Sequence, residues 1–434
     1  MNLNKNTFVI SLGTLLEWAE FTFFAYMADY LSHIFFPIDD PDLARLKIYG
    51  VFAASYLMRP AGAIFFGHIG DRYGRKPPMI ASLLLMAVAT FSMGILPTYA
   101  SIGVISSILL VIFRMIQGFA VGGEFNGATV VLTEHDKTHP FLAGAWTSFA
   151  SAAGMAFGGL MAAIVSTFSV HYADLWRLPF LLSSVLALVA IYLRKDMDET
   201  EDFRIAKKNN SLFRFPIIAA WKYNKAGLIC TAAFSMFISV YVYTGNIYYR
   251  TIAVNIGKIA QEQAALAITI GVSLNTILIP IFANIADKTN GKKLCVIGLF
   301  SALIFSPIII FLATIGDFCY VLLGQCIYGV IDAIVSATAF TILMRYFKTE
   351  TKYSGTSFAW SIITAIFGGT ALIANEFLMM KTQTALSCGF YMSVCALICL
   401  IVLRIISKKS KRSRGGGILL TTKNNLYRKS IVNM

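Results

Sequence analysis

Charged side chains are scarce in this sequence. They make up only 13% of its 434 residues, whereas 57% are hydrophobic and the mean hydropathy is +0.70. Ordinary soluble domains carry about 25% charged residues. The composition therefore excludes a soluble globular protein and indicates a chain that lies in a membrane.

Cysteine is also sparse, and its spacing carries no metal or disulfide pattern. The seven cysteines all lie beyond residue 229, in or beside apolar runs, and none forms a C-x-x-C pair. We interpret them as small packing side chains. We therefore expect no metal site, no disulfide framework and no cofactor.

Catalytic signatures are missing as well. The sequence has no G-x-S-x-G elbow, no metal-ligand cluster and no P-loop, and this last absence argues against transport driven by ATP. His135 and His139 have the i, i+4 spacing of a zinc pair, but they lie outside an H-E-x-x-H sequence. We interpret them as helix-end residues and expect no enzymatic activity.

The sequence has long apolar runs instead. A membrane-spanning helix needs about 20 apolar residues, and twelve such runs can be placed. We therefore predict an all-α integral membrane protein with twelve transmembrane helices. The runs lie near residues 8–35, 48–68, 78–97, 104–131, 140–168, 176–193, 226–249, 263–286, 294–315, 319–344, 353–379 and 386–405.

The net charge of +14 follows the predicted topology. If both termini are cytoplasmic, outer loops hold only five of the 36 Lys and Arg residues, and three more lie in spans or at their edges. The remaining 28 are cytoplasmic, which is the positive-inside pattern. We expect a multi-pass protein of the cell inner membrane, in contact with lipid, and no nucleic-acid partner.

The segment 67–76 reads Gly-His-Ile-Gly-Asp-Arg-Tyr-Gly-Arg-Lys between two apolar runs. Four charges within six residues cannot lie in hydrocarbon, so this is a turn at the cytoplasmic membrane surface. A weaker copy, Ala-Asp-Lys-Thr-Asn-Gly-Lys-Lys, occupies residues 286–293 and places Asp287 half a chain after Asp71. Such parallel repeats flank a midplane site in alternating-access carriers.

The repeat predicts two pseudo-symmetric six-helix bundles, residues 1–193 and 225–406. A basic cytoplasmic linker, residues 194–224, joins them, and a polybasic cytoplasmic tail, residues 407–434, follows. We expect part of the linker to form a helix at the membrane surface.

The segment 67–76 resembles the G-x-x-x-D-R-x-G-R-K signature of the major facilitator superfamily, which lies between the second and third helices. The resemblance implies an inner gate held closed by this turn, an acidic residue that ends the fourth helix, and a weaker second copy. The gate residues so assigned are Gly67, Asp71, Arg72, Gly74, Arg75, Glu134 and Asp287.

Other segments narrow the resemblance. Arg114-x-x-Gln117-Gly is followed by Gly-Gly-Glu124, the first helix has Leu-Glu-Trp, and residues 176–180 read Trp-Arg-Leu-Pro-Phe. These are similar to motifs of the metabolite:proton symporter family, whose members carry proline and glycine betaine, 2-oxoglutarate, citrate or shikimate. The resemblance implies that Arg114 takes part in proton coupling.

Acidic residues lie deep in the first span. Glu17 and Glu20 share one helical face, roughly 13 and 18 Å from its start at Phe8. A charge at mid-membrane costs about 3 kcal/mol, so they are expected to face a watery cavity or to form a structural ion pair. Arg59 in the second span is a plausible partner of either. Whether that pair would bind substrate or only join helices stays open.

The fourth span holds three further polar residues. Gln117 and Glu124 are seven apart on one face, and Arg114 lies about 60° round the helix. Burial cost favours a cavity role for Arg114 and Glu124.

The second half offers fewer candidates. Tyr243 and Asn246 belong to a polar-aromatic patch, either a substrate lid or an interfacial belt, and Asp332 is expected to face a cavity. Family members usually have a proline near Leu372, and its absence predicts the loss of a kink there.

Together these features predict a monomeric, proton-coupled secondary transporter that imports a small polar metabolite by alternating access. Mixed charges at the midplane favour a zwitterion such as proline or glycine betaine. The alternatives are a carrier of a di- or tricarboxylate such as 2-oxoglutarate or citrate and, in another class, a membrane receptor that does not transport.

Overall fold

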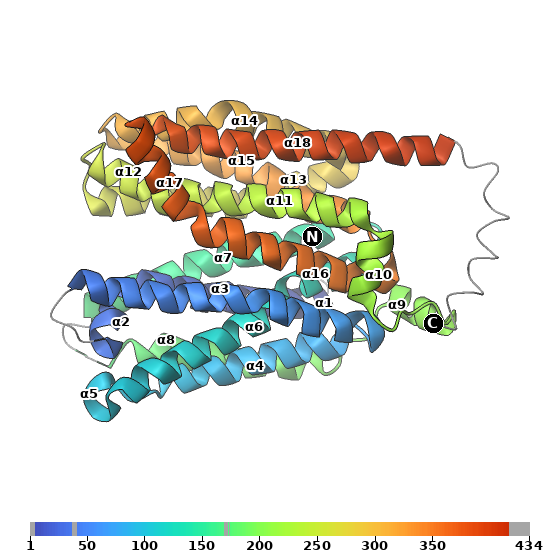
Figure 1. The fold of residues 1–434 in the computed structure, drawn as a ribbon, viewed down its shortest axis with the longest axis horizontal. Coiled ribbons are helices and arrows are strands. Elements are labelled where there is room, and N and C mark those ends of the chain that lie inside the picture. The colour runs from blue at the N-terminus through green and yellow to red at the C-terminus, as the bar shows by residue number, and fades with distance from the viewer. Residues whose placement is uncertain (1–4, 37–40, 169–171, 173, 416–434) are drawn as a thin grey trace.

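The computed structural model describes residues 5–36, 41–168, 172 and 174–415, which form helices and no strand. The two halves of the chain make two helical bundles that lie side by side, with their long helices roughly parallel (Figure 1). The first half forms the blue-to-green bundle and the second half the yellow-to-red one. This arrangement confirms the predicted fold class.

The first bundle is built from six long helices and two short ones. They are α1 (Lys5–Tyr26), α2 (Ala28–Phe35), α3 (Pro41–Arg72), α4 (Lys76–Gly94), α5 (Tyr99–Ile102), α6 (Val104–His135), α7 (Pro140–Phe168) and α8 (Arg177–Arg194).

The second bundle contains two helices that are interrupted by π-helical turns, η1 and η3, and a short 3₁₀ turn, η2. Its elements are α11 (Lys225–Val242), η1 (Tyr243–Tyr248), α12 (Tyr249–Asn255), α13 (Gln261–Lys288), α14 (Gly291–Thr314), α15 (Phe318–Met344), η2 (Thr349–Thr351), α16 (Lys352–Ile363), η3 (Thr364–Gly368), α17 (Gly369–Thr382) and α18 (Leu386–Gly415).

Two short helices, α9 (Glu201–Lys208) and α10 (Pro216–Tyr223), connect the bundles at one end of the molecule (Figure 1). We call this the linker end. The α3–α4 turn lies there too, whereas α2, α5 and α12 lie at the opposite end, which we call the far end.

Eleven helical segments of the described chain are long and apolar enough to cross a membrane. The twelfth predicted span, residues 48–68, lies within α3, which packs along α6. Glycines bring these two backbones together: a Cβ atom on Gly62 would come within 1.8 Å of the Phe119 carbonyl oxygen, and one on Gly118 within 1.9 Å of the Ser55 carbonyl oxygen. Such close contact between membrane helices is possible only for residues with the smallest side chains.

The boundaries differ from the sequence prediction at several places. The first span breaks at Met27 into α1 and α2, and α3 begins seven residues before the predicted start at 48. Arg194, predicted to begin the linker, ends α8 instead and is fully buried. Helix α18 continues to Gly415, and the rest of the predicted tail, residues 416–434, lies outside the described residues.

The expected loss of a kink in the eleventh span was wrong. Helix α16 runs along the bundle, but α17 leaves it at a steep angle (Figure 1). The change of direction follows the π-helical turn Thr364–Gly368. A π-turn inserts one extra residue into a helix and bends it without proline.

The bundles touch each other in their linker-end halves. Small side chains of α7, Ala145 and Ala152, pack against Ala283 of α13 and Ala333 of α15. On the other side of the interface, α16 packs against α3 and α6. The structure is therefore closed at the linker end.

Candidate functional site

Asp71, at the end of α3, binds the start of α16 in the other bundle. Its two carboxylate oxygens accept hydrogen bonds from the backbone N–H groups of Tyr353 (3.1 Å) and Ser354 (2.7 Å). These N–H groups lie in the first turn of α16, where the helix dipole favours a negative charge. The predicted gate residue Asp71 therefore joins the two bundles directly.

Arg75 connects Asp71 to Glu134, and all three side chains are buried. Its Nη1 donates to Asp71 (2.7 Å), its Nε and Nη2 donate to the two oxygens of Glu134 (3.2 Å each), and Nη2 also donates to the Thr349 carbonyl (2.7 Å). Burial alone would lower the pKa of Arg75, but the carboxylates of Glu134 and Asp71 outweigh it and raise the pKa above its ordinary value. The guanidinium therefore stays charged.

Glu134 also binds residues that the sequence did not single out. Lys352 at the start of α16 donates to it from Nζ (3.0 Å), and the Thr200 hydroxyl donates from the linker (2.7 Å). Both bundles and the linker thus meet at one carboxylate. The sequence around Lys352 does not mark it as a partner of Glu134, because only the packing of α16 brings the two side chains together.

Tyr353 fills the space beside these charges. Its hydroxyl donates to the Gly123 carbonyl of α6 (2.8 Å). A Cβ atom on Gly70 would lie 2.5 Å from its ring, and one on Gly127 would lie 2.0 Å from its hydroxyl oxygen. Gly67 packs equally closely on Ser354, with 2.7 Å from a Cβ to its Cα. Glycine is required at these positions because the neighbouring helix leaves no room.

Gly74 and Arg72 have different places in the turn. Gly74 adopts a φ of +127°, which side-chain-bearing residues rarely adopt, and a Cβ there would lie 2.2 Å from Glu199 of the linker. Arg72 is partly exposed and donates to the Arg214 carbonyl (3.2 Å). Arg72 therefore lies outside the buried Asp71–Arg75–Glu134 network and contacts the linker instead.

Asp287 occupies the equivalent position in the second bundle. Its oxygens accept hydrogen bonds from the N–H groups of Phe141 (2.8 Å) and Leu142 (2.9 Å), at the start of α7. Each bundle thus extends one aspartate to a helix N-terminus of the other. Asp71 has Arg75 in addition, whereas these partners of Asp287 are backbone groups.

Glu20 and Arg114 form a buried ion pair in the middle of the first bundle. Arg114 Nη1 donates to Glu20 (3.1 Å) and to the Gln117 side-chain oxygen (2.8 Å), and Gln117 donates in turn to Thr90 Oγ1 (2.8 Å). The four side chains come from α1, α4 and α6, and each is at most 3% exposed. Glu20, Arg114 and Gln117 therefore meet, a grouping that the sequence analysis did not predict.

Arg59 lies beside this pair without a carboxylate of its own. The suggested ion pair with Glu20 is not formed, because Glu20 binds Arg114. The Arg59 guanidinium lies over the rings of Tyr56 (4.1 Å) and Phe21 (4.8 Å). Its Nε is buried and has no hydrogen-bond partner among the described residues.

Glu17 lies one helical turn from Glu20, at the linker-end side, and is 2% exposed. One of its carboxylate oxygens, Oε2, is also buried without a hydrogen-bond partner in the described chain. Among the charged side chains around Glu17, Glu124 and Arg59 have the strongest electrostatic influence on its carboxylate. The predicted partnership with Arg59 is therefore an electrostatic influence, with no ion-pair contact.

Glu124 does not join Gln117, although both lie on α6. Its carboxylate binds Arg194 through two hydrogen bonds, 2.5 Å from Nη2 and 3.1 Å from Nη1, and accepts a third from Ser82 (2.8 Å). Arg194 also donates to the carbonyls of Met79 and Ile10. This pair ties α1, α4, α6 and α8 together at the linker end.

The sequence analysis missed Arg194 because it follows an apolar run and was counted with the basic linker. A usable signal was present in Glu124, a buried carboxylate that needs an opposite charge.

The candidates of the second bundle lie among neutral polar groups. Asn246 in η1 donates to the Tyr328 hydroxyl (3.1 Å), and Asp332 accepts a hydrogen bond from Asn275. Tyr243 lies between the bundles, with its ring centroid 6.3 Å from that of Tyr56. It therefore contacts the first bundle near Arg59, which an interfacial belt would not do.

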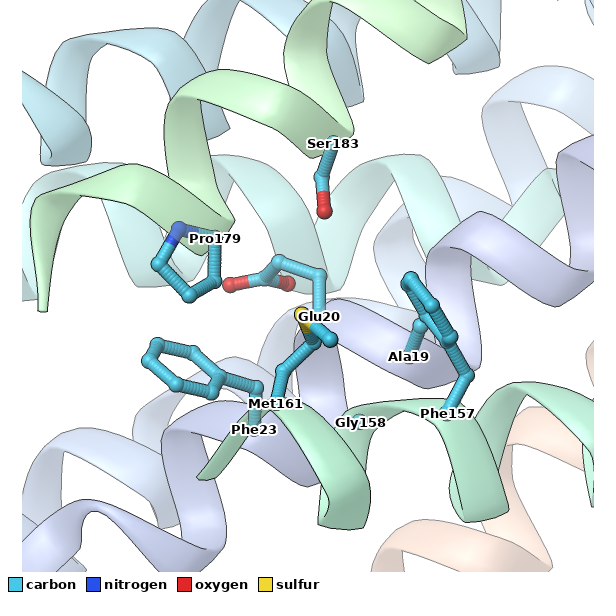
Figure 2. Close-up of a pocket in the computed structure, with 8 residues that line it drawn as sticks. All are labelled: Ala19, Glu20, Phe23, Phe157, Gly158, Met161, Pro179 and Ser183. Atoms are coloured by element: carbon cyan, nitrogen blue, oxygen red, sulfur yellow. The ribbon is translucent and has the colours of Figure 1, made fainter. Parts of the chain in front are cut away.

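Glu20 also lines a cavity of about 10 Å³, room for roughly one water molecule. Figure 2 shows its carboxylate pointing toward the side formed by Pro179 and Ser183 of α8. The opposite wall comes from α7, with Phe157 and Met161. Glu17, Arg59 and Arg114 do not line this cavity.

The Major Facilitator Superfamily profile matches residues 18–374, most of the chain. The chain belongs to the major facilitator superfamily. Three curated relatives align with nearly the whole length of this chain.

A Staphylococcus haemolyticus protein, provisionally named a proline/betaine transporter, is 31% identical over 412 residues, which cover 93% of this chain and 87% of the relative. The glycine betaine/proline/ectoine/pipecolic acid transporter OusA of Dickeya dadantii is 29% identical, and the proline/betaine transporter of Escherichia coli K12 is 28% identical. Both alignments cover 92% of this chain and 82% of the relative. They confirm the resemblance stated from the sequence motifs.

Solved structures of the superfamily share the fold. The proton:xylose symporter XylE bound to 6-bromo-6-deoxy-D-glucose superposes with a TM-score of 0.74 at 15% identity, over 93% of this chain and 95% of XylE. The human organic anion transporter MFSD10 gives a TM-score of 0.69 at 15% identity, over 92% of this chain and 99% of MFSD10.

Proposed function

We propose that this protein is a proton-coupled symporter that imports a small zwitterion, proline or glycine betaine, by alternating access. The names of its curated relatives support this substrate class. The observation that carries the proposal is the distribution of carboxylate partners among three arginines buried inside the first bundle, Arg59, Arg114 and Arg194. Arg114 is paired with Glu20 and Arg194 with Glu124, while Arg59, which also has a buried Nε without a hydrogen-bond partner, forms no ion pair with a carboxylate among the described residues.

Arg59, which has no carboxylate partner of its own in the described chain, can bind one carboxylate of the substrate. A buried N–H donor without a partner costs about 1–3 kcal/mol, and a substrate carboxylate on Arg59 would recover this energy. A dicarboxylate needs a second cation, which would have to be taken from Glu20 or Glu124. A zwitterion brings its own positive charge and leaves both ion pairs in place.

Glu20 is the proposed proton site. When its carboxylate takes up a proton, the attraction that holds Arg114 is lost, and the N–H groups of Arg114 become available. The adjoining cavity is large enough for a water molecule that would carry the proton to the carboxylate. Proton and substrate binding would then change the same small group of charges.

The inner gate is proposed to consist of the Asp71–Arg75–Glu134 network, with Lys352 and Thr200, and of the weaker Asp287 contact. In this proposal the linker end is cytoplasmic, both termini lie on that side, and the protein works as a monomer in the cell inner membrane. Opening requires Asp71 to leave the α16 N-terminus and Asp287 to leave that of α7, so the two bundles must rock as rigid bodies.

Uptake into proteoliposomes tests the proposal. An inward proton gradient is expected to drive accumulation of labelled proline and glycine betaine, and collapse of the gradient with an ionophore is expected to stop it. Accumulation of 2-oxoglutarate or citrate alone would show a carboxylate carrier instead. Tight binding of a zwitterion with neither uptake nor counterflow would show a receptor.

A further inference from the structure

Four aromatic rings meet where the two bundles touch. Trp18 of α1 and Phe125 of α6 come from the first bundle, and Phe340 of α15 and Trp360 of α16 come from the second. The ring centroids lie 6.0 Å apart for Trp18–Phe125, 5.8 Å for Phe125–Trp360, 5.2 Å for Phe125–Phe340 and 4.9 Å for Phe340–Trp360. We call these four side chains the aromatic floor.

The aromatic floor is sealed on its linker-end side. Trp360 lies about two helical turns beyond Tyr353, which binds Asp71 through its backbone N–H and the Gly123 carbonyl through its hydroxyl at the linker-end start of α16. Trp18 and Trp360 are nevertheless partly exposed, although both pack against the core of the second bundle. Their accessible surface therefore lies beside rings contributed by both bundles.

Arg59 is within reach of this surface. The ring of Phe21 contacts both: its centroid is 6.1 Å from that of Trp18, and the Arg59 guanidinium lies over it. The Trp18 indole N–H is buried and has no hydrogen-bond partner among the described residues. Arg59 and Trp18, each with a buried N–H that lacks a hydrogen-bond partner among the described residues, thus both contact the ring of Phe21.

This arrangement matches the two ends of a zwitterion. The faces of aromatic rings carry negative potential and attract cations, tryptophan most strongly, and they repel carboxylates. N–H donors attract carboxylates. We propose that the aromatic floor holds the positively charged nitrogen of the substrate while Arg59 holds its carboxylate. This assignment rests on the proposed function and adds the orientation of the substrate.

The floor favours nitrogen that carries methyl groups. A trimethylammonium group has no N–H, so it cannot donate a hydrogen bond and depends on ring faces. The secondary ammonium of proline has N–H groups that can also donate to the unpaired oxygen of Glu17. Loss of a floor tryptophan therefore weakens glycine betaine binding more than proline binding.

The floor also links binding to movement. Two of its rings come from each bundle, so a cation seated among them attracts both bundles at once. The bound substrate would stabilise the contact between them on the far-end side and promote closure over the site.

Equilibrium binding of labelled glycine betaine and proline to the full-length protein in lipid nanodiscs tests the assignment. Trp360→Ala and Trp18→Ala are each expected to weaken glycine betaine binding about tenfold and proline binding about threefold. Trp360→Phe, which keeps an aromatic face, is expected to stay within about threefold of the wild type. Trp221→Ala, at an exposed tryptophan of α10, is the matched control and is expected to bind normally.

Wild-type affinity for glycine betaine in both Trp18→Ala and Trp360→Ala would overturn the floor while leaving the proposed function intact. Equal loss of both substrates in Trp360→Phe and Trp360→Ala would also overturn it, since the ring face would then be irrelevant. If either alanine variant unfolds, Trp360→Leu and Trp360→Phe provide the comparison at nearly constant volume. A wild-type protein that binds and transports neither zwitterion would instead refute the proposed function.

Discussion

The two bundles share a fold but hold their deep polar groups in different ways. Besides the Asp71–Arg75–Glu134 network at the linker end, the first bundle buries two carboxylate–arginine pairs, Glu20–Arg114 and Glu124–Arg194. At comparable depth the second bundle relies on amides and tyrosines, such as Asn246 with Tyr328, and on Asp332 held by Asn275. A change of charge therefore has its main consequences in the first bundle.

The two bundles also differ in the regularity of their helices. Among the described residues, π-helical turns occur in the second bundle, at 243–248 and 364–368, whereas the equivalent helices α1 and α7 are regular beside their glycine contacts. Asn375 of α17 donates to Thr244 in η1, and the Tyr248 hydroxyl donates to Glu376, so the far-end parts of these two helices are bonded together. The second bundle thus has the π-helical turns, and the first has the buried ion pairs.

The largest effect is expected from breaking an ion pair of the first bundle. Arg194→Ala leaves Glu124 buried without its partner and should destabilise the protein by about 3–5 kcal/mol. Thermal unfolding in detergent micelles measures this loss. The double variant Arg194→Ala/Glu124→Ala should recover part of it. Asp332→Asn, in the second bundle, should change the melting temperature little, and equal losses in both bundles would refute the contrast.

The next largest difference between the two bundles is expected in proton coupling. Glu20→Gln removes the titrating carboxylate and should lower gradient-driven uptake about a hundredfold, while counterflow without a gradient stays within about threefold. Asp332→Asn should reduce both activities together and by less. A variant of Glu20 that still accumulates substrate against a gradient would place the proton elsewhere.

The two aspartates at the linker end give a smaller contrast. Asp71→Asn weakens bonds to the α16 N-terminus and leaves Arg75 with one carboxylate fewer, whereas Asp287→Asn affects two backbone bonds. Charge-assisted bonds contribute about 1.5–3 kcal/mol, so the open population should rise about tenfold for Asp71 and about threefold for Asp287. The labelling rate of Ala145→Cys, in a cysteine-free background, by a maleimide added from the linker side measures the opening.

The smallest effect is expected at Arg72. Arg72 is partly exposed and lies outside the buried network. Arg72→Ala should therefore change the free energy of opening, obtained from the same labelling rate, by less than about 0.5 kcal/mol. Arg75→Ala should raise the labelling rate about as much as Asp71→Asn does. The pKa of Arg75 is raised, so its charge and its contribution persist as the pH rises. The difference between the two variants should therefore be constant between about pH 6 and about pH 9.

Much of this architecture could be predicted from the sequence because the membrane leaves few options. Apolar runs of sufficient length must be helices, and the repeated turn places Asp71 and Asp287 at equivalent ends. The cost of burying charge also identified Glu20 and Arg114, which form a pair.

Partners from distant parts of the chain could not be predicted. Arg194 ends an apolar run, so its sequence neighbours suggested a linker residue, and only the packing of α8 brings it to Glu124. The bend after Ile363 was missed because a π-turn has no single residue as its signature, unlike proline. The aromatic floor combines residues from four helices, and single-chain periodicity does not show which faces meet.

Tyr353 has a consequence for relatives of this protein. Its ring occupies the room that glycine leaves at positions 70 and 127, so these three positions, in opposite halves of the chain, can vary only together. A chimera that joins one half of this chain to the other half of a relative should seal at the linker end only when the borrowed half supplies a matching shape. The linker-end seal therefore depends on matched halves, even though each half resembles a copy of the other.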